Sequence, residues 1–215
     1  YLTEDRADSL LYRFIPNEEG KLARGGRLEA LALEGVADTR NWNAVAVRPG
    51  ETLSARWILL ADVTSPNDDL RQRGAAMGAA LFARGEGIWM GDGELYFTCT
   101  SGGPERLGQI FRLTPRATGD TLDLFFESSD PAALHYGDNL CVAPRGDLVV
   151  CEDQGGDAVD NHIRWITADG VSSPFARLRI QTEWAGACFS PDGQTLFVNA
   201  YSPARTIAIR GPFRA

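Results

Sequence analysis

The sequence lacks the features that mark several common classes of protein. Its longest apolar stretches, around residues 57–63 and 75–83, fall far short of the roughly 20 residues that cross a bilayer. Positive charge is in deficit, with 21 basic against 29 acidic residues and a net charge of −8. This balance disfavours nucleic acid or an anionic membrane as a partner. We therefore expect no nucleic-acid partner and no membrane span, whereas cations and small polar molecules are compatible ligands.

Familiar catalytic strings are also missing. The sequence contains no GxSxG, HExxH or CxxC string, which argues against the common serine-hydrolase, zinc-protease, zinc-knuckle and thioredoxin-type sites. The two histidines, His135 and His162, have no metal-ligand partners nearby in sequence. No signal peptide is visible, because the sequence opens at Tyr1 on YLTEDR, which is typical of the end of a strand. We therefore interpret the chain as a mature or truncated piece.

What the sequence does contain is an internal repeat. With 215 residues, 44% of them hydrophobic, the chain can bury a core of ordinary size. The stretches GIWMGDGELYFTCT, LCVAPRGDLVVCED and ACFSPDGQTLFVNA align without gaps on Gly93, Gly146 and Gly193. Each has an apolar strand, a turn built on Pro or Gly with Asp, and a second alternating strand, which indicates a β-hairpin. The opening YLTEDR matches only the second strand of this unit.

Further strands are predicted after each hairpin, at residues 9–16, 108–115, 161–170 and 205–213. A repeat near 50 residues with about four short strands is typical of a β-propeller blade, although other structural repeats stay open. We therefore predict an all-β fold in a single domain, residues 1–215, with about four blades, the first incomplete, and no closed ring. Residues 67–83 break the pattern and predict a helical insertion capped by Asn67 or Asp68.

The repeat also predicts the state of the four cysteines. They are expected to be buried as small apolar residues and to form no disulfide. Cys141 and Cys188 occupy the same repeat position in different blades, and Cys151 is out of register with Cys141 across their own turn. The fourth is Cys99.

Acidic residues follow the apolar strand in VVCEDQGGD, residues 149–157, which supplies Glu152, Asp153 and Asp157. A turn centred on Arg145 and Gly146 would place Asn139 opposite Glu152. The repeat spacing then places other residues in equivalent positions: Glu86 opposite Cys99, Gly186 opposite Asn199, and Glu4 in the place of Glu152. Equivalent strand ends converge on a propeller axis. We therefore expect one face to carry Glu4, Glu86, Asn139, Glu152 and Asn199, with Asp5, Asp138 and Asp153 adjacent.

Such crowded carboxylates need compensating positive charge. Arg84 and Arg6 could supply it, and so could bound multivalent cations such as calcium or iron, for which carboxylate oxygen is a good ligand. A plainer interpretation stays open, in which acidic residues at strand ends serve turns and solubility.

Five strings of the sequence, in this order, resemble the C-terminal half of PhoX-type alkaline phosphatases and of the wider bacterial family that contains them: YLTEDR, FARGEGIWMGDGELYFTCTSGG, DNLCVAPRGDLVVCED, GACFSPDGQTLFVN and TIAIRGPF. The resemblance implies a six-bladed propeller that hydrolyses small phosphomonoesters with a cofactor of ferric iron (Fe3+) and calcium (Ca2+). It also implies export, so that a periplasmic or secreted location is expected. We further expect a monomer.

Carried over residue by residue, the resemblance makes Glu4 in TED an iron ligand, and Glu86 in RGEG and Glu152 in CED calcium or bridging ligands. Asp153 would be a further metal ligand. Arg84 would be the catalytic phosphate contact, and Asn139 is expected to border the same substrate pocket.

Two departures from the family pattern matter. The N-terminal half of the family is absent, so the complete cofactor is not expected from this piece alone. Ala204 and Phe213 replace a common glycine and tryptophan, which we interpret as a change in packing. A non-catalytic propeller that binds a protein or small ligand is the alternative function, because fold alone does not decide activity.

Overall fold

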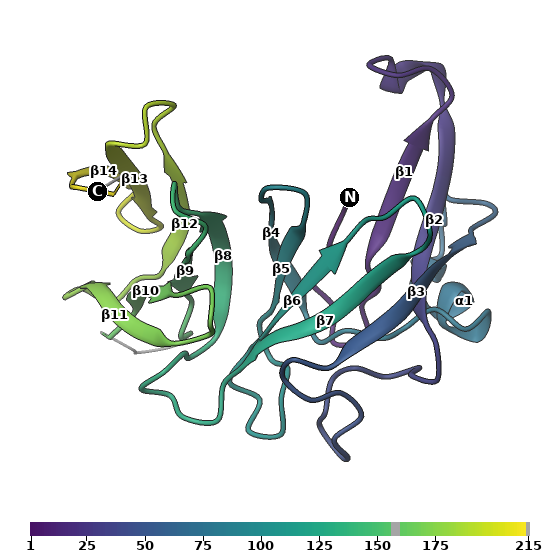
Figure 1. Cartoon of the computed structure of the whole chain (residues 1–215), viewed down its shortest axis with the longest axis horizontal. Coiled ribbons are helices and arrows are strands. Elements are labelled where there is room, and N and C mark those ends of the chain that lie inside the picture. Colours follow the sequence, from purple (N-terminus) through teal and green to yellow (C-terminus); the bar gives the residue numbers. More distant parts are fainter. Residues whose placement is uncertain (156–159, 214–215) are drawn as a thin grey trace.

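The computed structural model describes residues 1–155 and 160–213, and these residues form curled antiparallel sheets (Figure 1). Blade 1 contains β1 (Tyr12–Pro16), β2 (Gly26–Leu33) and β3 (Thr52–Leu59). Blade 2 contains β4 (Gly85–Met90), β5 (Leu95–Cys99), β6 (Gln109–Thr114) and β7 (Asp120–Glu127). Blade 3 contains β8 (Gly137–Val142), β9 (Leu148–Glu152), β10 (His162–Ile166) and β11 (Ser172–Arg177). Blade 4 contains β12 (Trp184–Phe189), β13 (Thr195–Ala200) and β14 (Arg205–Arg210).

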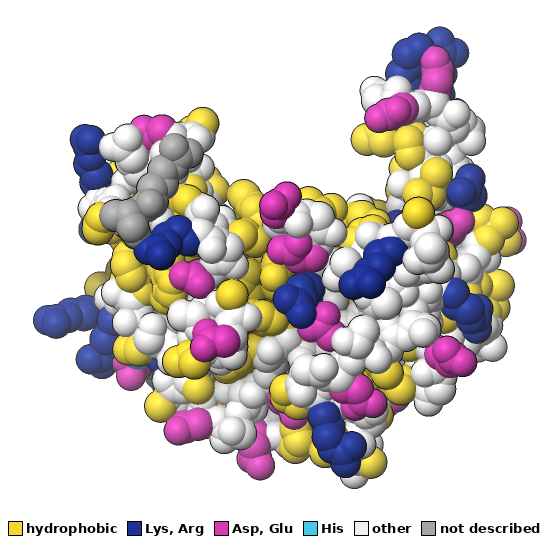
Figure 2. All heavy atoms as spheres, in the orientation of Figure 1, with side chains coloured by type: hydrophobic (Ala, Val, Ile, Leu, Met, Phe, Trp, Pro, Cys, Tyr) yellow, Lys and Arg dark blue, Asp and Glu magenta, His cyan; other side chains and the backbone are white. Residues whose placement is uncertain are grey.

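The predicted all-β, incomplete propeller is therefore confirmed. The first blade is partial, since YLTEDR contributes only an isolated antiparallel bridge between Leu2 and Tyr12. The first and last blades stand apart in Figure 1, and the ring between them is open. Figure 2 shows apolar side chains exposed along the hollow between them, with acidic and basic side chains interspersed over the rest of this face.

The blades are joined in two different ways. Strand β3 pairs with both β2 and β7, so that blades 1 and 2 form one seven-stranded sheet. Blade 3 is a separate four-stranded sheet and blade 4 a three-stranded one. The innermost strands of blades 2, 3 and 4 meet side by side: β4 packs on β8, and β8 packs on β12.

The core lies between the faces of neighbouring blades. Phe82, Phe97 and Phe111 are fully buried and meet in edge-to-face and stacked pairs, with ring centroids 5.2–5.5 Å apart. Cys99, Cys141 and Cys151 are buried as predicted, whereas Cys188 is exposed, and all four are free, which confirms the prediction of no disulfide. None of the helices in the described residues is long and apolar enough to cross a membrane.

The helical insertion is shorter than predicted. Helix α1 spans only Leu70–Ala76, and its N-cap is Asp69 instead of Asn67 or Asp68. A 3-10 turn, η1 (Leu22–Arg24), lies between β1 and β2. The helix stops before Gly78, whose φ of 96° is left-handed. The alanine-rich part of the segment is extended instead, because Phe82 bridges Ser9 and fills the core.

The predicted hairpin register needs a correction. All three innermost strands carry a bulge at the same place: between Gly85 and Ile88, between Gly137 and Leu140, and between Trp184 and Ala187. In blade 3 the register next to the turn already differs by one residue from the prediction, since Leu140 pairs with Val150. The bulge adds a second residue, so that Gly137 and not Asn139 pairs with Glu152. In blade 2 it is Gly85 and not Glu86 that pairs with Cys99. A bulge adds one residue to one strand only, which gap-free alignment of the repeats does not reveal.

The bulges are tied to the contact between blades. A Cβ atom on Gly87 would lie 2.5 Å from the carbonyl oxygen of Asp138 and 2.7 Å from the Cα of Asn139. Only glycine therefore lets the bulged part of β4 approach the bulged part of β8 this closely. The extra residue re-aims Glu86 and Asp138 toward the end of the blades, where the acidic residues gather.

Candidate axial site

Arg84 occupies the centre of the acidic cluster. Its Nε donates to Asp5 Oδ1 at 2.7 Å, and its Nη2 donates to Asp5 Oδ2 at 3.3 Å and to Glu86 Oε1 at 3.0 Å. These carboxylates raise the pKa of the Arg84 guanidinium, chiefly through the hydrogen bond to Asp5, and the charge of Asp153 adds to the effect. Of the acidic residues expected to share one face with Arg84, the structure brings Glu86 into contact with it and Asp153 within reach of its charge.

The backbone of Arg84 adopts an uncommon conformation for a side-chain-bearing residue. Its φ is 57°, in the left-handed region that costs a non-glycine residue about 1–2 kcal/mol. Two backbone hydrogen bonds hold it there: Arg84 N donates to Arg6 O at 2.9 Å, and Arg84 O accepts from Thr100 N at 3.0 Å. Strained backbone that the surroundings enforce is frequent at functional sites.

Glu86 and Asp138 form a pair of carboxyl groups beside this arginine. Burial, the hydrogen bond to Asp138 and the charges of Asp138 and Asp5 raise the pKa of Glu86 to about 9, although Arg84 opposes the shift. Burial likewise raises the pKa of Asp138. Asn139 lies next to the pair, and its Nδ2 donates to Asp138 Oδ2 at 3.1 Å. One arginine is thus insufficient to compensate the negative charge gathered here.

A second pair of carboxyl groups consists of Asp153 and Glu183. Their mutual hydrogen bond, followed by burial and the charges of Asp153 and Asp138, raises the pKa of Glu183 to about 7. Both residues line a cavity of about 310 Å³ together with Gln154, Gly155, Gln181, Thr182, Tyr201 and Ser202. The axial cluster is therefore made up of Asp5, Arg84, Glu86, Asp138, Asp153 and Glu183.

Glu4 and Arg6 have other partners in the structure. Glu4 accepts from Tyr12 Oη at 2.8 Å and lies 3.6 Å from Arg71 Nη1. Its neighbour Asp5, which points to the opposite side of the chain, is the residue that reaches Arg84. Arg6 pairs with Asp68 at 3.7 Å, and Asn199 accepts from Thr206 at 2.8 Å. The structure thus brings Asp5, and not Glu4, to the axial cluster.

Glu152 is fully buried within blade 3. Its Oε1 accepts from Arg164 Nε at 2.6 Å and from the backbone N–H of His135 at 3.0 Å. Its Oε2 accepts from the backbone N–H of His162 at 2.8 Å and lies 3.3 Å from the Nδ1 of that residue. The charge of Glu152 is therefore already balanced by a buried arginine. The structure does not bring its carboxyl group together with those of Glu86 and Glu4.

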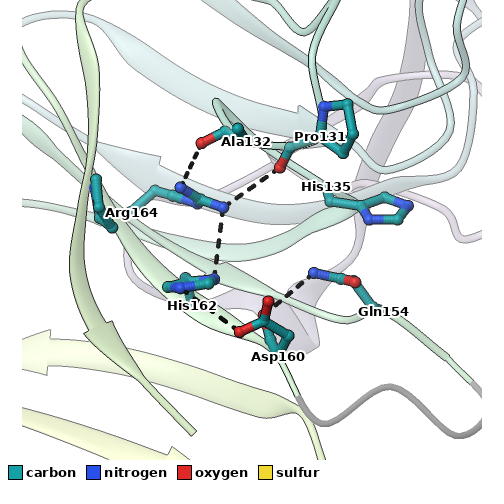
Figure 3. Close-up of a pocket in the computed structure, with 8 residues that line it drawn as sticks. Pro131, Ala132, His135, Gln154, Asp160, His162 and Arg164 are labelled. Atoms are coloured by element: carbon teal, nitrogen blue, oxygen red, sulfur yellow. Dashed lines mark hydrogen bonds and ion pairs between the residues drawn. The ribbon is translucent and has the colours of Figure 1, made fainter.

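Arg164 extends this network along a cavity of about 410 Å³ (Figure 3). Its guanidinium donates to the carbonyls of Ala132 at 2.6 Å and Pro131 at 3.3 Å. The labelled side chains in Figure 3 come from the β7–β8 connection and from β10 with the segment before it. Through Arg164, Glu152 is therefore linked to the backbone of the β7–β8 connection, which indicates a structural role. Asp157, the third acid of its motif, lies outside the described residues.

Sequence reasoning gave no site role to Glu183 and only an adjacent place to Asp5. A signal for Asp5 was available in the alternation of strand side chains, since TED and CED both end in a second acid that faces away from the first. For Glu183 there was no repeat signal, because the equivalent positions of the other blades carry no acid.

The axial cluster meets the chemical requirement of a cation site only in part. Its oxygen donors suit hard cations such as calcium. The pKa values of Glu86 and Glu183 are raised, chiefly by burial at Glu86 and by the hydrogen bond to Asp153 at Glu183, so the ionised carboxylates are disfavoured there without a cation. Within residues 1–155 and 160–213, however, no three acidic, histidine or cysteine side chains converge closely enough to hold a metal ion. The chain supplies suitable donors without a complete ligand set.

These features define a partial propeller with a carboxylate-rich axial face around one strained arginine. The sequence profile of the family described as Alkaline phosphatase PhoX matches residues 1–204, and the chain belongs to that family. The predicted family is thereby confirmed. No curated protein matches the chain significantly.

Solved structures resemble the fold to different degrees. Pseudomonas fluorescens PhoX in complex with vanadate, a transition state analogue, has a TM-score of 0.68 and 22% identity, over 92% of this chain and 45% of that one. The chain thus spans less than half the length of that phosphatase. XC5397 from Xanthomonas campestris, a gluconolactonase, has a TM-score of 0.42 and 16% identity, over 96% and 58% of the two chains. A luciferin-regenerating enzyme has a TM-score of 0.48 and 11% identity, over 94% and 62%.

Proposed function

We propose that this chain is part of a metal-dependent phosphomonoester hydrolase of the alkaline phosphatase type. The observation that carries the proposal is Arg84, which is held in a left-handed backbone conformation inside a cluster of undercompensated carboxyl groups. Membership of the PhoX family supports this reaction class. The match to the vanadate complex supports the fold only.

Arg84 is the catalytic phosphate contact in this proposal. A guanidinium carries five N–H donors in a plane that fits phosphate oxygens. Three of them, one on Nε and two on Nη2, are directed at Asp5 and Glu86. The structure shows no hydrogen-bond partner for Nη1 among the described residues, so its two donors can face a substrate. Asn139, beside Asp138, is proposed to border the same substrate site.

Glu86 and Asp153 are the proposed metal ligands of this chain, with Asp138 and Glu183 next to them. The cofactor that the family resemblance implies contains ferric iron and calcium, which would neutralise phosphate oxygens and lower the pKa of a nucleophilic oxygen. Glu4 and Glu152 as ligands stay predictions, because in this structure their carboxyl groups are engaged by Tyr12 and Arg164. We further propose a periplasmic or secreted monomer that acts on small phosphomonoesters.

The test uses the full-length protein, purified with its bound metals. Hydrolysis of p-nitrophenyl phosphate is measured together with iron and calcium content, before and after chelation. We expect activity that is lost on chelation, and a Glu86→Gln variant with reduced activity and metal content. A protein that contains no stoichiometric metal and does not hydrolyse the ester would instead be a binding propeller. Turnover and metal content that are unaffected by Glu86→Gln would remove Glu86 as a metal ligand.

A comparison of two ligand variants refines the metal assignment. Glu86→Gln and Glu152→Gln remove the same charge from the two acidic networks while preserving side-chain size. If only Glu86 binds metal, metal content falls in the first variant and not in folded protein of the second. An equal loss of metal in both variants would support Glu152 as a ligand.

A further inference from the structure

Asp5 makes the most complete contact with the proposed phosphate-binding arginine. Two oxygens of Asp5 accept from one edge of the Arg84 guanidinium, at 2.7 Å from Nε and 3.3 Å from Nη2. Asp5 belongs to the segment before β1, and Arg84 lies just before β4, so the contact joins blade 1 to blade 2. The pair is 35% exposed at Arg84 and 50% exposed at Asp5, which places it at the surface, where a substrate can reach it.

The same short segment also holds the backbone of Arg84. Arg6 O accepts from Arg84 N at 2.9 Å, and it accepts from Ser9 N at 3.1 Å as well. Arg84 is therefore fixed to residues 5–6 at two levels, through its peptide N–H and through its guanidinium. A side chain with four rotatable bonds is otherwise expensive to order, at up to about 2 kcal/mol of lost rotamer freedom.

We propose that Asp5 is the positioning residue that orients Arg84 for binding of the substrate phosphate. This inference rests on the proposed function. Asp5 holds the Nε–Nη2 edge of the guanidinium, so the Nη1 donors point away from the protein contacts. Without Asp5, the guanidinium would be attracted to the carboxylates of Glu86, Asp138 and Asp153 instead, and its donors would be consumed there.

The chain contains a matched control for this contact. Asp38 accepts from Arg40 Nε at 2.8 Å and from Arg40 Nη2 at 2.6 Å, a two-point pair of the same kind outside the axial cluster. Asp38→Asn therefore breaks an equivalent ion pair without touching Arg84. It reports what the loss of one such surface pair does to folding alone.

The experiment compares Asp5→Asn, Asp5→Glu and Asp38→Asn in the full-length protein loaded with its metals. The readouts are kcat and KM for p-nitrophenyl phosphate, the inhibition constant of inorganic phosphate, and Tm. We expect Asp5→Asn to lower kcat/KM by about 10- to 100-fold and to weaken phosphate inhibition, because a two-point charged contact is lost. Asp5→Glu should recover part of this loss, and Asp38→Asn should retain activity within about twofold.

Coupling to Arg84 distinguishes positioning from a general structural role. In an Arg84→Ala background, Asp5→Asn should cause no further loss of kcat/KM, since there is no guanidinium left to orient. An equal loss in both backgrounds, or equal effects of Asp5→Asn and Asp38→Asn, would overturn the inference. A wild-type protein that neither hydrolyses the ester nor responds to phosphate would refute the proposed function and this inference with it. An active wild type with a fully active Asp5→Asn variant would refute only the role of Asp5.

Discussion

Two acidic networks lie at strand ends of this molecule, and they differ in how their charge is balanced. In blade 3, Glu152 is fully buried, yet Arg164 and two backbone N–H groups satisfy its carboxylate. In the axial cluster, Arg84 faces Asp5, Glu86, Asp138 and Asp153, and the pKa of Glu86 is still raised to about 9. The carboxylate of the first network has all its partners within the fold, whereas the carboxyl groups of the second disfavour their ionised state.

The comparison shows that burial of an acid is a poor guide to its role. Glu152 is the more buried residue, and its complete set of partners indicates a structural function. Retaining a carboxyl group with a strongly raised pKa is unfavourable for the apo fold and needs another reason, of which ligand binding is the most direct. A perturbed, partly exposed acid is therefore the better candidate for function.

The largest expected effect concerns the buried ion pair of Glu152 and Arg164. Glu152→Ala leaves Arg164 buried without its carboxylate and should destabilise the fold by about 3–5 kcal/mol. Glu86→Ala should change the stability of metal-free protein little or increase it, since it removes a partly buried carboxyl group that the folded state has to keep protonated. Urea unfolding of both variants after chelation measures the difference. The comparison breaks down if Glu86→Ala is as destabilising as Glu152→Ala.

A smaller effect is expected at the contact between β4 and β8. A Cβ on Gly87 would meet Asp138 O at 2.5 Å, so Gly87→Ala should separate the bulged strands and cost about 1–3 kcal/mol. Gly85→Ala is the matched control, because its Cβ would lie 3.4 Å from Thr3, an ordinary contact. Denaturant midpoints measure stability. Equal midpoints for the two variants would show that β4 can shift without cost.

The smallest effect is a dependence of stability on pH in the metal-free protein. Glu86 has its pKa raised from 4.5 to about 9 and Glu183 from 4.5 to about 7. Between the ordinary and the raised pKa of each group, the folded state retains a proton that the unfolded state has released. Stability should therefore fall as pH rises from about 5 to about 9. Tm measured across this range in chelator should decline, and less so in Glu86→Gln. An identical decline in that variant would assign the effect to other groups.

The blades, the open ring and the unpaired cysteines could be predicted from the sequence, because hairpin turns and alternating strands are local patterns. The membership of the axial cluster could be predicted only in part. Glu4 and Asp5, like Glu152 and Asp153, are neighbours on extended chain, so a shift of one residue exchanges which of them faces the axis. In β4 and β8, bulges introduce shifts of the same kind at Glu86 and Asp138, and these bulges depend on the approach of two blades. Repeat spacing does not encode that approach.

The pairing of β3 with β7 has a consequence for how the axial cluster responds to motion. Asp5 and Arg84 are both attached to the seven-stranded sheet, in which backbone hydrogen bonds run without interruption. Asp138, Asp153 and Glu183 lie on or next to strands of the other two sheets. The four-stranded sheet packs on the first through β4 and β8, and the three-stranded sheet packs on β8 through β12. The cluster therefore spans a boundary between sheets that is held by side-chain packing and not by backbone hydrogen bonds. Relative movement of the two sheets would change the distance between Glu86 and Asp138 before it disturbed the Asp5–Arg84 ion pair. The geometry of Arg84 is therefore expected to stay constant while the position of the facing carboxyl groups adjusts.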